Sequence, residues 1–366
     1  MPISAVDTIN PAIEHTKQQL FRPFRIVQWT KLAVVGLLAG ELSSGGCNFN
    51  QFQHPGKGTH SPFPNLAGID FALLGGLIAV LVVTGLVLGL ILMYISSVMR
   101  FILFDSVIAK ECRIREGWSR RQGPGFRYFL WKLLYVFAMI AGFVVLIGVP
   151  LAFAFAMGWI RHAKEYVLPL VLGGIFLLFV LLVFVISMAV IFVLTKDFVI
   201  PQMALEDIGA IEGWRRLWPI MKAEMGGYVA YLGLKIALAI AAGIVVGIAT
   251  LILGLIVAIP TAGLGILAIL TGKSAGLTWN AYTITLAIVV GSGLLSIFLY
   301  LVSLISVPVI VFFPAYSIYF FAGRYQPLAA VLYPGSPSPA LAPPAAIVGP
   351  PSIPPYPEPT AGAGRR

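Results

Sequence analysis

The feature that most constrains this chain is a set of five long stretches without Asp, Glu, Lys or Arg. A charged side chain at the centre of a membrane helix costs about 2.5 to 3.5 kcal/mol, whereas each Leu, Ile, Phe or Val returns only about 0.3 to 0.6 kcal/mol. Each stretch also exceeds the roughly 20 residues that a helix needs to cross a bilayer. The sequence therefore predicts transmembrane helices in residues 71–99, 133–160, 166–195, 236–272 and 274–323.

The composition excludes a soluble protein. Of the 366 residues, 59% are hydrophobic and 10% are charged, against about 45 to 50% and about 25% in soluble domains. Residues 26–42 give a sixth, weaker span, because Lys31 and Glu41 flank its apolar centre and a long charged side chain near a helix end can reach the membrane surface. The predicted fold class is all-α, a polytopic membrane bundle of about six transmembrane helices.

Prolines divide the two longest stretches. At about 1.5 Å per residue, either stretch as one helix would extend well beyond the roughly 30 Å hydrocarbon core of a bilayer. Pro260 is expected to end or bend the fifth span, and Pro308 and Pro314 to bend the sixth. Residues 257–272 and 307–322 are open to three interpretations, as re-entrant segments, interfacial segments or extra spans.

Lys and Arg are distributed unevenly between alternate loops. Twenty of the 24 lie near the termini or in loops 100–132 and 196–235. Because cytoplasmic flanks are enriched in Lys and Arg, we expect a cell (inner) membrane protein with both termini cytoplasmic and loops 43–70, 158–165 and 262–281 exported. The same asymmetry explains the net charge of +10 without a nucleic-acid partner. The four exceptions are Lys57, Arg161, Lys164 and Lys273.

A threefold internal repeat runs through the predicted spans. In each copy a Lys stands at the cytoplasmic start of an odd-numbered span, and an Ala-Gly pair follows seven to nine residues later. The simplest repeating unit is a basic cytoplasmic segment followed by a helical hairpin. The three copies are Trp29 to Lys31 with Ala39-Gly40, Trp131-Lys132 with Ala141-Gly142, and Leu234-Lys235 with Ala242-Gly243.

The basic segments are predicted to contact lipids. Residues 204–225 place apolar side chains three and four apart, which is one helical face. Residues 1–25 form a similar amphipathic segment, in which a helix is expected to begin at Asn10-Pro11. We expect these helices to lie on the membrane surface; the alternative is linker helices packed on the ends of the spans. Anionic lipid headgroups are the expected partners. The predicted contacts are Arg120, Arg121, Arg215, Arg216, Trp118 and Trp214.

Residues 334–366 differ in composition from the rest of the chain. They are rich in Pro, Ala, Gly and Ser and carry too few bulky apolar side chains for a core, so they are predicted to be a disordered tail. The domain organisation is then a cytoplasmic segment at 1–25, a six-helix membrane domain at 26–333 and this tail.

Catalytic and metal-binding motifs are missing from the sequence. Cys47 and Cys112 fall in loops on opposite sides of the predicted membrane and cannot pair within the chain. His54 and His60 share a loop with Cys47 and Asp70, but their spacing fits solvated side chains better than a metal site. We therefore expect no cofactor, no metal and no enzymatic activity.

Three sequence features carry a family resemblance. They are the hairpin repeats, the segment Phe21-Arg22-Pro23-Phe24 that leads to Trp29, and Asp197-Phe198-Val199-Ile200-Pro201 followed by Glu212 to Trp218. In these the chain resembles uncharacterised prokaryotic multi-pass membrane proteins related to the membrane domain of glycerophosphodiester phosphodiesterases. In fused members of that family a separate soluble domain carries the chemistry, so the resemblance implies the membrane fold and not hydrolase activity.

Three functional hypotheses follow. The first is a non-enzymatic structural, regulatory or partner-binding component of the membrane. The second is a carrier or facilitator for a lipid or other apolar small molecule, with proline-broken helices around a cavity. The third, a lipid-modifying enzyme, requires polar groups that converge at one membrane face. A closed bundle favours the first, a wet cavity between helices the second, and a cleft with His, Asp and Arg the third.

Overall fold

A computed structural model describes residues 4–41, 71–159, 162, 165–274 and 281–333, and within these the chain is helical, without strands. The predicted all-α class is confirmed. Short helices are α1 (Ile9–Phe21), α2 (Ile26–Ala39), α6 (Ile200–Glu206), α7 (Ala210–Ala223) and α10 (Gln326–Leu332). Long helices are α3 (Phe71–Ile108), α4 (Ile114–Ala156), α5 (Val167–Leu194), α8 (Met225–Ser274) and α9 (Ala281–Ala322), and the π-helix η4 (Thr195–Val199) joins α5 to α6.

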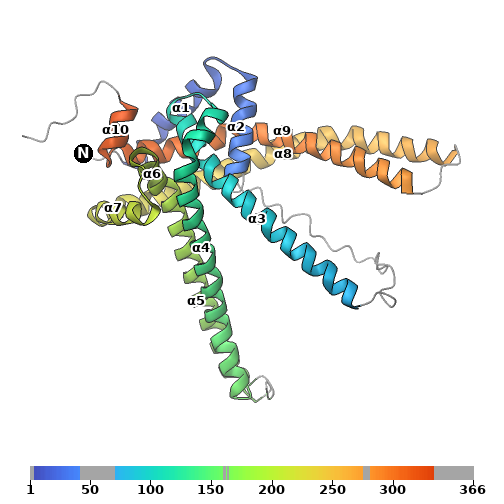
Figure 1. The fold of residues 1–366 in the computed structure, drawn as a ribbon, viewed down its shortest axis with the longest axis horizontal. Coiled ribbons are helices and arrows are strands. Elements are labelled where there is room, and N and C mark those ends of the chain that lie inside the picture. The colour runs from blue at the N-terminus through green and yellow to red at the C-terminus, as the bar shows by residue number, and fades with distance from the viewer. Residues whose placement is uncertain (1–3, 42–70, 160–161, 163–164, 275–280, 334–366) are drawn as a thin grey trace, which may run out of the picture.

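Three apolar arms extend from one helical core (Figure 1). One arm is the hairpin of α4 and α5, another is the hairpin of α8 and α9, and the third is α3. Five helices within the described residues are long and apolar enough to cross a membrane, and they coincide with the five charge-free stretches. The sequence placed these spans correctly, although their helices extend beyond the predicted ends.

The sixth predicted span is wrong. The helix at this place, α2, has 14 residues and is shorter than a membrane crossing. It ends at Gly40, whose backbone is left-handed (φ 79°), and the Glu41 N–H donates to the Gly36 carbonyl at 2.9 Å. Glycine tolerates this conformation without steric cost, so it stops the helix. Glu41 is thereby turned into the core, among residues from the basic ends of the arms, and not toward an exported loop.

Each arm changes from exposed to buried along its length. On α3 the side chains of residues 80–92 are largely exposed, whereas Val98 to Leu103 are buried. On α9 exposure ends near Tyr300, and Val307 to Phe321 pack in the core. Exposed Leu, Ile, Val and Phe are stable where hydrocarbon is the solvent. The arms therefore carry the membrane-facing surface, and the core lies at their bases.

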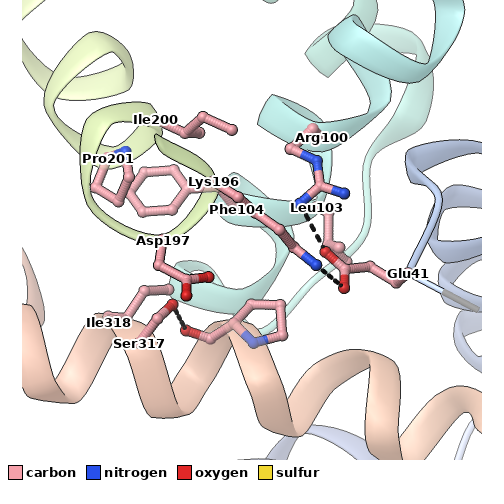
Figure 2. Close-up of a pocket in the computed structure, with 11 residues that line it drawn as sticks. Glu41, Arg100, Leu103, Phe104, Lys196, Asp197, Ile200, Pro201, Ser317 and Ile318 are labelled. Carbon is pink, nitrogen blue, oxygen red and sulfur yellow. Dashed lines mark hydrogen bonds and ion pairs between the residues drawn. The ribbon is translucent and has the colours of Figure 1, made fainter. Parts of the chain in front are cut away.

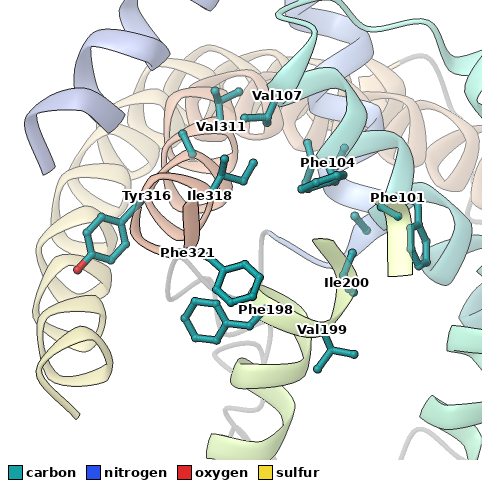
Figure 3. Packing of buried hydrophobic residues seen from close by; sticks show 14 of the residues in the cluster. Phe101, Phe104, Val107, Phe198, Val199, Ile200, Val311, Tyr316, Ile318 and Phe321 are labelled. Carbon is teal, nitrogen blue, oxygen red and sulfur yellow. The ribbon is translucent and has the colours of Figure 1, made fainter. Parts of the chain in front are cut away.

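Aromatic rings dominate the core, where α8, α9 and η4 meet (Figure 3). Phe198 of η4 lies 5.1 Å from Tyr231 and 5.2 Å from Phe321, measured between ring centroids. Tyr231 in turn lies 4.5 Å from Phe320 and stacks on Tyr316 at 5.1 Å. Rings at such separations add about 0.5 to 1.5 kcal/mol per pair beyond their burial.

One expectation about helix breaks needs correction, because no helix ends at Pro260. Both α8 and α9 continue through Pro260, Pro308 and Pro314. Residues 307–322 form the end of α9 that is buried in the core. A proline inside a helix costs about 3 kcal/mol, and burial of the large apolar and aromatic side chains around Pro308 and Pro314 offsets this cost there.

The amphipathic segment 204–225 is also not one helix. It divides at Asp207, whose φ of 53° ends α6 before α7 begins. A Cβ atom on Gly213 would lie 2.7 Å from the Val199 side chain, so glycine lets α7 pack closely against η4. This contact agrees with the alternative interpretation, in which such helices are linkers packed on the ends of the spans.

Candidate functional site

The π-helix η4 holds the charged residues that connect the arms. It contains Thr195, Lys196 and Asp197, all on the end of the α4–α5 arm. A π-helical turn inserts an extra residue into a helix and occurs frequently at functional sites. Thr195 accepts a hydrogen bond at 2.9 Å from the indole N–H of Trp214, which ties η4 to α7.

Glu41 lies between two cations from different arms (Figure 2). Its Oε1 is 2.9 Å from Arg100 Nη1 at the base of α3, and its Oε2 is 2.5 Å from Lys196 Nζ. Arg100 also donates to the carbonyl of Ala39 at 2.6 Å. The Glu41 side chain is only 2% exposed. One carboxylate thus joins α2, α3 and the α4–α5 arm.

Asp197 makes the matching connection to the α8–α9 arm. Its Oδ2 accepts hydrogen bonds from Lys235 Nζ and, at 3.0 Å, from the Tyr231 hydroxyl, and both partners belong to α8. All three side chains are largely buried. We define the ionic junction as Glu41, Arg100, Lys196, Asp197 and Lys235. It brings together the short helix α2 and all three arms.

The electrostatics of the ionic junction favour ionised carboxylates. Burial alone would raise the pKa of Glu41, but the positive charges of Lys196 and Arg100 outweigh burial and lower the pKa to about 2. The junction holds three cations and two carboxylates, so removal of either carboxylate leaves like charges facing each other in a buried site.

A small cavity lies beside the ionic junction. Its volume is about 30 Å³, and Glu41, Lys196, Asp197 and Ser317 contribute polar groups to its wall. The space suits one or two water molecules, which need two to four polar partners. Ser317 donates to the Pro314 carbonyl at 2.9 Å, as Figure 2 shows. The cavity is too small for a lipid or a metabolite.

Two further ion pairs surround the ionic junction. Asp105 of α3 receives two hydrogen bonds from Arg121 of α4, both at 2.6 Å, and Arg121 also donates to the Ala204 carbonyl at 2.7 Å. Arg324 donates to both carboxylate oxygens of Glu224 at 2.7 and 2.8 Å. Such bidentate pairs fix orientation as well as charge. They fasten helix ends to one another around the core.

The six residues predicted to contact lipid have different environments. Arg121 is occupied by Asp105, and Arg216 pairs with Glu206 and Glu212. Arg120 and Arg215 are exposed; the Arg215 side chain is 82% exposed, with Glu212 at 3.5 Å.

Both tryptophans of this set are half-buried against the core. Trp118 packs edge-on against Tyr94 at 6.3 Å, and Trp214 bonds to Thr195. Lipid contact at these six positions stays a prediction. Among the six side chains, Arg120 and Arg215 are the most accessible to lipid.

Sequence reasoning missed the ionic junction. From the sequence, Lys235 was expected at the cytoplasmic start of a span, Glu41 near the end of the sixth span, and Lys196 in a basic loop, whereas Asp197 entered only as part of the family resemblance. A usable signal was present, because acidic residues beside apolar helices are rare and are usually functional. His15 was also missed; it is buried, with Nε2 2.8 Å from the Val107 carbonyl and Nδ1 3.2 Å from the Tyr319 hydroxyl.

Several predicted features lie outside the described residues. These are the loop with Cys47, His54 and His60, and the tail at 334–366. Within the part of the chain that the structure describes, no three His, Cys, Asp or Glu side chains are grouped as metal ligands.

Comparison with known proteins gives one match. The model of a family of unknown function, DUF7544, matches residues 3–331. No curated protein and no solved structure matches significantly. The comparisons give no link to the glycerophosphodiester phosphodiesterases, so that resemblance has no support beyond the motifs quoted above.

Proposed function

The chain belongs to the DUF7544 family of unknown function, and we propose that it is a non-enzymatic membrane component in which the ionic junction holds three apolar arms as one body. In this proposal the arms cross a prokaryotic cell membrane and the core faces the cytoplasm, where it is available to lipids or to a protein partner. The charge-free arms and the concentration of Lys and Arg at their bases support this orientation.

The observation that carries the proposal is the pairing within the ionic junction. Glu41 binds cations from α3 and η4, and Asp197 binds a cation from α8, so charges from separate arms satisfy one another. Buried ion pairs contribute little net stability compared with apolar packing, but they can specify one arrangement of elements. A structural role uses that property, whereas catalysis or transport requires room for a substrate beside these groups.

The positions of the cavities favour this proposal over the carrier alternative. A cavity of about 390 Å³ lies beside the α1–α2 turn, and one of about 470 Å³ lies beside the base of α3. Both are at the surface of the core, whereas a carrier for an apolar molecule needs a cavity between membrane helices near the middle of the bilayer.

Reconstitution of the full chain in liposomes tests the two functions together. We expect headgroup-labelled lipids to cross these bilayers no faster than in protein-free vesicles. We also expect Glu41→Gln to lengthen and broaden the distance between spin labels at Leu37 of α2 and Leu86 of α3, with Glu14→Gln as the exposed control. Lipid transfer above the protein-free rate that falls in Glu41→Gln would overturn the proposal in favour of the carrier.

A further inference from the structure

The turn between α1 and α2 exposes apolar and basic side chains in alternation. Its sequence is Phe-Arg-Pro-Phe-Arg-Ile-Val, over residues 21–27. Phe21, Phe24, Ile26 and Val27 are each between 55% and 67% exposed. A contiguous apolar patch on a protein surface marks a site of interaction with a membrane or a partner. The turn contains none of the six residues predicted above to contact lipid headgroups.

Side-chain and backbone contacts fix the conformation of the turn. The Phe21 and Phe24 rings both pack on Trp29, at 5.7 and 5.5 Å between centroids. The Trp29 indole N–H donates to the Leu20 carbonyl at 3.0 Å, and a backbone bridge pairs Phe21 with Phe24. The two exposed rings are therefore held in place before anything binds them.

The turn lies level with the boundary between arm and core. The Thr30 and Tyr300 hydroxyls are 3.0 Å apart, which fixes the start of α2 beside α9. On α9 the side chains are exposed toward the tip as far as Tyr300, and burial begins at Ser303. Residues 281–300 span about 30 Å at about 1.5 Å per residue, which equals the thickness of a hydrocarbon core. With the tip at one membrane face, the turn is at the other.

Basic groups surround a cavity behind the turn. Arg22, Arg25 and Lys110 line a space of about 390 Å³, in which Glu111 is the single acidic residue. Lys110 is held there by two hydrogen bonds of 2.8 Å, from its Nζ to Gln18 and from Gln28 to its carbonyl. Its backbone is left-handed (φ 55°), which is uncommon for Lys. Within the described residues no acidic side chain pairs with Arg22 or Arg25.

We propose that the α1–α2 turn is a binding site for an anionic phospholipid. Phe21 and Phe24 enter the interfacial region of the bilayer, where aromatic rings are favoured. Arg22, Arg25 and Lys110 contact the phosphate and headgroup, because guanidinium groups pair with phosphate in a bidentate manner. A lipid satisfies both halves of the site, whereas free phosphate leaves the apolar half exposed. This proposal rests on the proposed function, because it requires that the three arms cross the membrane.

Lipid binding to the purified full chain tests the basic half. Native mass spectrometry in detergent compares the apparent affinities for phosphatidylglycerol and phosphatidylcholine. At about fivefold for each basic residue at a membrane surface, Arg22→Gln with Arg25→Gln should weaken phosphatidylglycerol binding about 25-fold and leave phosphatidylcholine binding unchanged. The matched control is Lys17→Gln with Arg115→Gln, which removes the same charge from exposed positions. Equal losses in the two variants, or displacement of the lipid by millimolar inorganic phosphate, would overturn the proposal.

Depth measurements in vesicles containing phosphatidylglycerol test the apolar half. On a cysteine-free background, a fluorophore at Phe24 should be quenched by lipids with a nitroxide at the headgroup. A fluorophore at Leu86, exposed on the α3 arm, should be quenched by nitroxides deep in the acyl chains. Quenching at Leu86 without quenching at Phe24 would refute the α1–α2 site alone. Absence of quenching at both positions would refute the membrane seating itself.

Discussion

Replacement of Glu41 by Gln tests the ionic junction directly. The substitution keeps the size of the side chain and removes its charge, so Arg100 and Lys196 are left buried without their carboxylate. The pKa of Glu41 falls from an ordinary 4.5 to about 2, and at 1.36 kcal/mol per pKa unit this corresponds to about 3 kcal/mol of folding free energy. Loss of one partner from a buried pair gives a similar figure, about 3 to 5 kcal/mol.

The sign of the pH dependence provides a second measurement of the same interaction. Because folding lowers the pKa of Glu41, its contribution to stability is fully present above pH 4.5 and is lost as the pH falls toward 2. Unfolding by SDS titration, followed by circular dichroism, should show Glu41→Gln less stable than the natural protein by about 3 kcal/mol at pH 7. The difference should shrink steadily below pH 4.5. Glu14→Gln, at an exposed position on α1, should have little effect.

A double substitution identifies the cause of the loss. If Glu41→Gln destabilises because Lys196 loses the carboxylate beside it, then adding Lys196→Met should recover part of the free energy of unfolding, because an apolar chain of similar length replaces the buried cation. A loss below about 1 kcal/mol for Glu41→Gln, or a further additive loss in the double variant, would refute the reasoning.

Three further predictions concern other parts of the chain. Cysteine labelling on a cysteine-free background should mark position 57 from outside the cell and position 115 only after permeabilisation; the reverse pattern would invert the orientation. Removal of residues 336–366 should leave insertion and thermal stability unchanged, and a large loss of extractable protein would show that they pack against the membrane domain. Burial lowers the pKa of His15, so its protonation as the pH falls below 6.5 should destabilise the docked α1, and His15→Gln should remove this acid sensitivity; unchanged sensitivity would place the titrating group elsewhere.

The arms were predictable from sequence because the constraint on them is local. A membrane helix must satisfy its backbone internally and expose apolar side chains, so about 20 charge-free residues identify it wherever it stands. The concentration of Lys and Arg at one end of the arms was also predictable, because these residues lie in the sequence directly beside the charge-free stretches. Gly117 precedes Trp118 as Gly213 precedes Trp214, and a Cβ on Gly117 would lie 3.1 Å from the Ile102 side chain, so both glycines permit close helix contacts.

The ionic junction was not predictable because its contacts are not local. Glu41 meets Arg100 across 59 positions and Lys196 across 155, and neither spacing has a periodicity that a single sequence can reveal. The error began at Gly40, whose left-handed backbone ends α2 after 14 residues. Apolar content alone counted this helix as a span and so placed Glu41 at its far end, away from Arg100 and Lys196. The glycine at the end of the apolar run was the available signal.

The position of the ionic junction at the base of the arms determines what a change there would do. The arms diverge beyond the core (Figure 1), whereas at the base α3 and α4 are in close contact, since a Cβ on Gly125 would lie 2.7 Å from Val98. An arm that rotates therefore does so about its base, and its membrane-facing part is about 30 Å long. A rotation of about 10° at the base displaces the tip of such an arm by about 5 Å, by simple geometry on that length. A partner or lipid that loosens Glu41 or Asp197 from its cation would thus alter helix tilt across the whole bilayer, so we expect substitutions in the core to change helix tilt more than substitutions at the tips.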